Sequence, residues 1–130
     1  MVKDTEKIHE LHASGLGCAQ VLVAMGLWKL GEENPRLVDA ARGLCFGCFC
    51  DKICGALTGA FLMLAMFDPK QAADYMIPEL ASWFEYEFGK LDCPEILEHN
   101  PGNKPFTCPP IIEKTYLKAK ELLQEVGYDL

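Results

Sequence analysis

The longest uncharged stretch of the chain restricts the fold more than any other feature of the sequence. It runs from residue 53 to residue 67 and contains fifteen residues, none of them Asp, Glu, Lys or Arg. A helix needs about 18 to 20 apolar residues to cross a bilayer, so this stretch is too short to span a membrane. We predict a buried core helix over residues 52–66, with Asp51 as its N-cap.

Helix start and stop signals divide the rest of the chain. Asn34-Pro35 and Asp68-Pro69 each combine an N-cap with proline at the first helical position, and Gly31 and Gly89 follow apolar segments. These signals predict helices over residues 4–14, 18–30, 35–43, 69–88 and 109–126, a kink or division at Pro78, and a short helical segment from Cys93. No β pattern or repeat is evident. We expect an all-α fold, a single compact bundle of five to seven helices in one domain over residues 1–130.

The charge balance restricts the partners. Nineteen acidic residues against twelve basic ones leave a formal charge of −7. No Lys/Arg cluster interrupts this excess, so we expect no nucleic-acid partner. The first residues are charged and lack the apolar stretch of a secretory signal, which predicts a cytoplasmic protein. A homodimer remains open, because the sequence does not separate an apolar dimer seam from ordinary core.

The seven cysteines are the strongest functional signal in the chain. Structural disulfides are rare in a reducing cytosol. An odd number of cysteines also cannot pair completely within one chain. The remaining interpretations are catalytic thiols, redox sensing and metal ligation.

Some of the cysteines fall at or within about one turn of a predicted helix N-terminus. The unpaired amides and the positive dipole end there favour a thiolate and lower its pKa, and they would also favour a negatively charged iron–sulfur cluster. Free cysteines are, on the other hand, common small core residues. We predict as catalytic thiols Cys18, Cys54, Cys93 and Cys108.

Two glycines follow Cys54 on the same predicted helix. Gly55 and Gly59 are four residues apart on one helix face, which lets another backbone come close. We predict that they border the functional site and bind a cofactor if one is present. Close helix packing alone is the alternative explanation.

The order of the four predicted catalytic cysteines resembles that of the redox-active protein family named for its C_GCAxxG_C_C pattern. The resemblance covers nearly the whole chain and implies a redox role, without an established substrate. A similar domain occurs in split-Soret cytochromes, which bind haem. This chain has no Cys-x-x-Cys-His sequence, so c-type haem is not expected. The resemblance is carried by Gly17-Cys18-Ala19-Gln20, by the CGAxxG motif over residues 54–59, by Cys93 after Phe88-Gly89, and by Cys108 before the last helix.

Three further cysteines depart from that family pattern. Cys45, Cys48 and Cys50 form, with Cys54, the spacing C-x2-C-x-C-x3-C. This spacing is close to the C-x2-C-x2-C-x3-C run of bacterial ferredoxins without reproducing it. These four cysteines are our predicted ligands for an iron–sulfur cluster or Zn²⁺, if one is bound. Disulfide exchange among them is the alternative.

The sequence therefore leaves two main functional hypotheses. The favoured one is thiol–disulfide oxidoreduction, in which Cys18 or Cys54 attacks a disulfide and a second cysteine resolves the mixed disulfide. Cys93 and Cys108 would be a second pair, and the partner would be a redox protein or a small thiol or disulfide. The alternative is an iron–sulfur electron-transfer or sensing module. A structural Zn²⁺ site ranks last, because the core looks sufficient without it.

Overall fold

The computed structural model describes residues 3–130, and these residues form eight α-helices joined by short 3₁₀ and π-helical segments. The prediction of an all-α fold is confirmed, with one helix more than the expected maximum of seven. The helices are α1 (Asp4–Ala13), α2 (Cys18–Leu30), α3 (Pro35–Ala40), α4 (Gly55–Phe67), α5 (Pro69–Gln71), α6 (Ile77–Phe88), α7 (Cys93–Ile96) and α8 (Lys104–Glu125).

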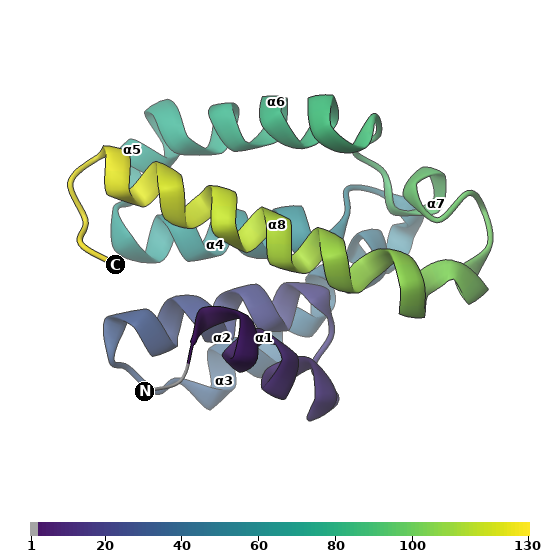
Figure 1. The fold of residues 1–130 in the computed structure, drawn as a ribbon, viewed down its shortest axis with the longest axis horizontal. Coiled ribbons are helices and arrows are strands. Elements are labelled where there is room, and N and C mark those ends of the chain that lie inside the picture. Colours follow the sequence, from purple (N-terminus) through teal and green to yellow (C-terminus); the bar gives the residue numbers. More distant parts are fainter. Residues whose placement is uncertain (1–2) are drawn as a thin grey trace.

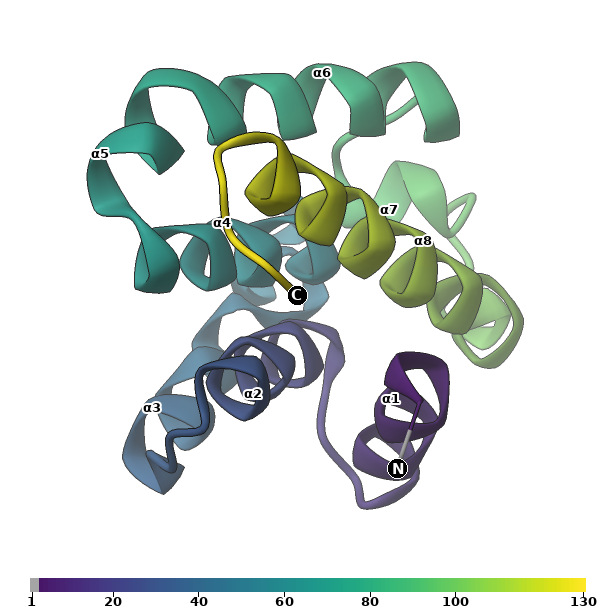
Figure 2. The same cartoon turned by 60° about the vertical axis from the view of Figure 1, so that its left-hand side comes forward.

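The helices are arranged in three levels (Figure 1). Helix α6 lies at the top, α4 and α8 cross the middle, and α1, α2 and α3 lie below. The view in Figure 2 keeps the same order. Helix α4 packs against both α2 and α8, so it is the central element of the fold. Among the described residues we find no helix with both the length and the hydropathy that a membrane span requires.

The central position of α4 follows from its sequence. Its residues are apolar on almost every side, and the side chains of Leu57, Met63 and Leu64 are fully buried. Helix α2 crosses it closely at Gly59, where an added Cβ would lie 2.7 Å from the Cα of Ala19. Only a residue without a side chain lets the two backbones approach this far.

The start of α4 differs from the prediction. The helix begins at Gly55 with Cys54 as N-cap, whereas we expected a start at residue 52 after an Asp51 cap. The backbone before it is occupied by an isolated antiparallel bridge between Ile53 and Asp92. The Cys54 N–H donates to the Leu91 carbonyl at 2.8 Å. Because this extended segment is held by a distant part of the chain, the local sequence did not reveal it.

The predicted helix over residues 69–88 is divided, as the proline at position 78 suggested. The Asp68 side chain caps α5 by accepting from the Gln71 N–H. A π-helical segment over Ala72–Met76 then leads into α6, and Pro78 lies in the first turn of α6. A proline is tolerated there because it has no N–H to donate and the first turn needs none.

Helix α8 begins earlier than expected. We predicted a start at Pro109, but the helix begins at Lys104 and contains Pro109 and Pro110. Cys108 therefore lies just beyond the first turn instead of at the N-terminus, so the amides and the dipole of this helix end stabilise a Cys108 thiolate less than we expected. The segment predicted over residues 35–43 divides into α3 and a 3₁₀ turn over Ala41–Leu44.

Candidate functional site

The four predicted catalytic cysteines meet at the end of the bundle where α2, α4 and α8 begin (Figure 1). Cys18 is the first residue of α2, Cys93 is the first residue of α7, and Cys54 caps α4. Together with Cys108 they line a cavity of about 10 Å³. That volume holds about one water molecule. The other lining residues are Ala56, Ile96, Leu97, Ile111 and Ile112.

The antiparallel bridge explains why two of these cysteines are neighbours. The Cys93 N–H donates to the Lys52 carbonyl at 2.8 Å, and the Cys54 N–H donates to the Leu91 carbonyl. These two bonds flank the Ile53–Asp92 pair, so Cys54 and Cys93 lie on the same face of the bridge. Residues almost forty positions apart are thereby fixed beside each other.

A fifth cysteine joins the cluster. Cys45 is 1% exposed and lies beside Cys18, whose thiol lowers the pKa of Cys45; the Cys45 thiol also lies 4.0 Å from the Ala41 carbonyl oxygen, to which it donates when protonated. Cys45 lies directly at the N-terminus of α2, where the backbone N–H groups of Ala19 and Gln20 donate to it. We had assigned Cys45 to the predicted metal ligands, and the structure places it beside Cys18.

Two glycines make room for the Cys18–Cys45 pair. An added Cβ at Gly17 would lie 2.5 Å from the Cys45 sulfur, and one at Gly55 would lie 2.5 Å from the Cys18 sulfur. Both distances are far shorter than van der Waals contact. A glycine next to a cysteine in the sequence was therefore the one local signal that another group approaches Cys18.

The environment of the pair favours a thiolate on Cys45. Its pKa is lowered from 9.0 to about 6 by the hydrogen bond from Cys18, against the opposing effect of burial. The two α2 amides and the charge of Arg42 lower it further. The same hydrogen bond, together with burial, raises the pKa of Cys18. The pair therefore favours the proton on Cys18 and the negative charge on Cys45.

The other three cysteines have the opposite electrostatics. Burial raises the pKa of Cys54 to about 12, although the N–H groups of Ala56 and Leu57 partly offset it. Burial also raises the pKa of Cys93 and of Cys108. These three cysteines are thiols at neutral pH.

Two surface grooves lead to the cysteines. The first, which we call the Cys18 groove, has a volume of about 410 Å³ and is lined by Cys18, Cys108 and Arg42 among others. The second, the Cys93 groove, has a volume of about 290 Å³ and includes Cys93, Asp51 and His99.

Phe46 and Lys104 border both grooves. The Lys104 ammonium lies 2.9 Å from the centre of the Phe46 ring, a cation–π contact that separates the two openings. Solvent thus reaches the cysteines through two grooves, one on each side of the Phe46–Lys104 contact.

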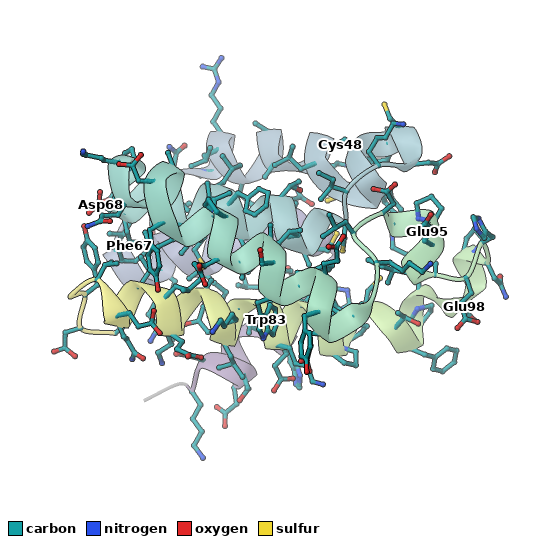
Figure 3. All side chains as sticks on the ribbon, turned by 90° about the horizontal axis from the view of Figure 1, so that it is seen from above. Cys48, Phe67, Asp68, Trp83, Glu95 and Glu98 are labelled. Atoms are coloured by element: carbon teal, nitrogen blue, oxygen red, sulfur yellow. The ribbon has the colours of Figure 1, made fainter. Side chains whose placement is uncertain are left out.

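The remaining predicted metal ligands do not gather around a common point. Cys50 is exposed, and Cys48 lies at the outer edge of the molecule on the loop over Gly47–Asp51 (Figure 3). Cys45 faces Cys18, and Cys54 faces the cavity. Within residues 3–130 no three His, Cys, Asp or Glu side chains are placed to hold a metal ion. Metal ligation by this set stays a prediction.

The two glycines of the CGAxxG motif lie against protein atoms. Gly55 faces Cys18 and the Leu44 carbonyl, and Gly59 faces the backbone of Ala19. Both therefore have a packing role. Their predicted part in cofactor binding is not tested by this arrangement.

The cysteines of this cluster lie within the part of the chain that matches a known protein family. The family model described as "Putative redox-active protein (C_GCAxxG_C_C)" matches residues 16–122. The chain belongs to this family. The matched segment contains all seven cysteines, and the family description names redox activity without a mechanism. No curated protein and no solved structure matches the chain.

Proposed function

We propose that this protein carries out thiol–disulfide redox chemistry with Cys18 and Cys45 as its dithiol. The observation that carries the proposal is the close placement of Cys18 and Cys45 at the N-terminus of α2, where an added Cβ at Gly55 would lie 2.5 Å from the Cys18 sulfur and 3.0 Å from the Cys45 Cα. A thiolate and a thiol in contact are the starting state for attack on a disulfide and its resolution. Cys54, the other predicted attacking residue, is less suited because it is buried and its pKa is raised.

Exposure assigns the two roles. Cys18 lines the open Cys18 groove, whereas Cys45 is 1% exposed and lies out of reach of a substrate. Cys18 therefore attacks. Its sulfur forms a bond to one sulfur of the incoming disulfide, and its proton passes to the Cys45 thiolate. The substrate S–S bond breaks, and the first product leaves as a thiolate.

Resolution uses the second cysteine. The departing thiolate, or water, takes the proton from Cys45, and the Cys45 thiolate attacks the Cys18 sulfur. The mixed disulfide breaks and the second product thiolate leaves, which solvent protonates. The thiol–thiolate pair has lost two electrons and one proton, solvent has supplied the second proton, and the substrate has become two thiols. In the reverse direction the α2 amides stabilise Cys45 as the leaving group.

Cys93 and Cys108 would form the second pair of this proposal. Cys93 is close enough to Cys108 to raise the pKa of that thiol, and both line the cavity that also includes Cys18. Each opens to a different groove. This arrangement supports thiol exchange between the Cys18–Cys45 dithiol and a second redox partner.

The proposal is tested by single-turnover oxidation of the reduced protein with a small neutral disulfide, 2-hydroxyethyl disulfide, followed by peptide mass spectrometry. We expect a Cys18–Cys45 disulfide as the product. Cys18→Ser lowers the rate at least about a hundredfold. Cys45→Ser leaves a mixed disulfide on Cys18 that is not resolved. Cys50→Ser is the matched control, because Cys50 is exposed and outside the cluster. Unchanged oxidation in Cys18→Ser would refute the assignment.

An iron–sulfur site is the second candidate function. The observation in its favour is that four cysteines line one cavity, and the cavity of about 10 Å³ would have to widen to hold a cluster. Iron, acid-labile sulfide and zinc are measured on protein purified without oxygen. Stoichiometric iron and sulfide would replace the dithiol proposal with a cluster protein. Stoichiometric zinc alone would indicate a structural site.

A further inference from the structure

The lining of the Cys18 groove differs in charge from the rest of the chain. The chain has nineteen acidic and twelve basic residues. The eleven residues that line the groove include Arg42 and Lys104 and no Asp or Glu. A groove lined by two cationic side chains and by no carboxylate, on an otherwise acidic protein, favours an anionic ligand.

Both cations lack a carboxylate partner. Within residues 3–130, neither Arg42 nor Lys104 has an acidic oxygen within 4.0 Å, whereas seven lysine–carboxylate pairs form elsewhere. Lys104 instead rests on the Phe46 ring, a contact that leaves its N–H groups able to donate. Arg42 is exposed, and it lies near enough to Cys45 to lower the pKa of that thiol.

The Cys93 groove offers a contrast. It shares Lys104 but also contains Asp51. Asp51 raises the pKa of Cys93 and so opposes the effect of Lys104. An anion is therefore attracted to the opening that exposes Cys18 more than to the one that exposes Cys93.

We propose that the Cys18 groove selects small disulfides that carry carboxylates. The inference rests on the proposed function and names the substrate class of the same site. The groove, at about 410 Å³, lies within the usual size range of small-molecule sites. Arg42 binds one carboxylate through a two-pronged hydrogen bond, and Lys104 attracts the other. The S–S bond then lies over the Cys18 sulfur.

The chemistry adds no further reactant. The reduced Cys18–Cys45 pair supplies two electrons and one proton, solvent supplies the second proton, and one molecule of the dicarboxylate disulfide accepts them. A Cys18–Cys45 disulfide and two molecules of the thiol carboxylic acid result. A single turnover of pre-reduced protein therefore measures the whole reaction.

The experiment compares three disulfides of nearly equal size and different charge. These are 3,3′-dithiodipropionate (dianion), 2-hydroxyethyl disulfide (neutral) and cystamine (dication). We expect the wild type to react at least about tenfold faster with the dianion than with cystamine, after correction for the intrinsic reactivity of each disulfide with a free thiol. Arg42→Gln and Lys104→Gln each reduce this preference several-fold.

Arg36→Gln is the matched control. Arg36 is exposed, lies outside both grooves, and its substitution changes the net charge by the same amount. Its charge preference is expected to equal that of the wild type. Arg42→Gln also changes the pKa of Cys45, which affects the reaction rate with every disulfide. The rate with the neutral disulfide measures this common effect, so the ratio of rates between charged and neutral substrates measures recognition of the substrate charge.

The outcomes separate the two proposals. If all three disulfides react and the corrected rates show no charge preference, or if Arg36→Gln lowers the preference as much as Arg42→Gln, the anionic class is wrong and the dithiol function stands. If no disulfide reacts with the reduced protein, the dithiol function fails and the substrate assignment falls with it. Far-UV circular dichroism checks that each variant is folded.

Discussion

The Cys18–Cys45 pair and the neighbouring group of Cys54, Cys93 and Cys108 contain the same functional group in opposite electrostatic settings. Cys45 is among the most buried of the seven, yet its pKa is lowered to about 6. Cys54 is also buried, and its pKa is raised to about 12. Burial alone therefore does not decide the state of a thiol here.

The number and the kind of donors explain the difference. The pKa of Cys45 is lowered by the Cys18 thiol, by the two helix amides of Ala19 and Gln20, and by the charge of Arg42. Only the Ala56 and Leu57 amides of its own helix lower the pKa of Cys54, in a cavity otherwise lined by cysteines and aliphatic side chains. The neighbouring Cys18 thiol is thus the main reason that Cys45 favours a thiolate whereas Cys54 stays a thiol.

Separating the two regions should have the largest effect. An Ala at Gly59 would place its Cβ 2.7 Å from the Cα and carbonyl oxygen of Ala19, which pushes α2 away from α4. We expect the free energy of unfolding to fall by about 3 kcal/mol, because backbone atoms cannot yield as side chains do. Urea denaturation under reducing conditions measures it.

Gly43→Ala is the control for that substitution. Nothing lies within 4 Å of a Cβ at Gly43, so we expect a change within about 0.5 kcal/mol. Equal costs at the two positions would show that the α2–α4 crossing is not the constraint that holds the two regions together.

The lowered pKa of Cys45 should make the free energy of unfolding depend on pH, an effect of intermediate size. The folded pKa of Cys45, about 6, is below the ordinary value of 9.0, so the unfolded chain binds more protons between these values. The stability that the Cys45 thiolate contributes to the folded state is complete above pH 9 and is lost as the pH falls through 6. We expect the stability difference between wild type and Cys45→Ala to grow by on the order of 1 kcal/mol per pH unit from pH 6 to 8.

The raised pKa of Cys54 acts in the opposite direction. Its contribution is present below pH 9 and is lost as the pH rises toward 12. The titration is followed by thiolate absorbance near 240 nm, with urea denaturation at each pH. A difference between wild type and Cys45→Ala that stays flat from pH 6 to 8 would contradict the thiolate assigned to Cys45.

The smallest effect concerns the cap of α4. Cys54→Ala removes a buried sulfur at the N-cap of α4, near the Ala56 and Leu57 amides, and we expect a loss of about 1 kcal/mol. Cys50→Ala, at an exposed position, should change stability by less than about 0.5 kcal/mol. Equal values for the two variants, measured by urea denaturation, would mean that Cys54 does not cap the helix.

Local signals predicted most of the helices. Helix α2 has the predicted bounds because Gly31, in the left-handed conformation at φ 71°, ends it. Asn34 and Asp68 cap the helices that follow them, as expected. Each of these features depends on a few adjacent residues, which is why the sequence reveals them.

Features set by distant contacts were not predictable in the same way. The Ile53–Asp92 bridge moved the start of α4 to Gly55 and placed Cys93 beside Cys54. Phe46 and Phe49 adopt positive φ angles that neither residue type favours. These positions depend on how the loop packs against the rest of the fold.

Cys45 shows the same limit at the site itself. Its spacing to Cys48 and Cys50 suggested a ligand run, but tertiary packing turns its side chain toward the N-terminus of α2. The convergence of Cys18, Cys54, Cys93 and Cys108 was foreseen only in outline, from their expected places near helix N-termini. The grooves and the charges that line them needed the folded structure.

The cavity draws its lining from Cys18 near the start of the chain and Cys108 near its end. During synthesis the first half of the chain leaves the ribosome before α8 exists, so Cys18 and Cys45 can meet while Cys54 still lacks its later neighbours. An oxidant acting on the nascent chain would then find the future dithiol first. A disulfide formed that early would join the two cysteines that we propose as the dithiol, so under this proposal premature oxidation would not trap a wrong fold.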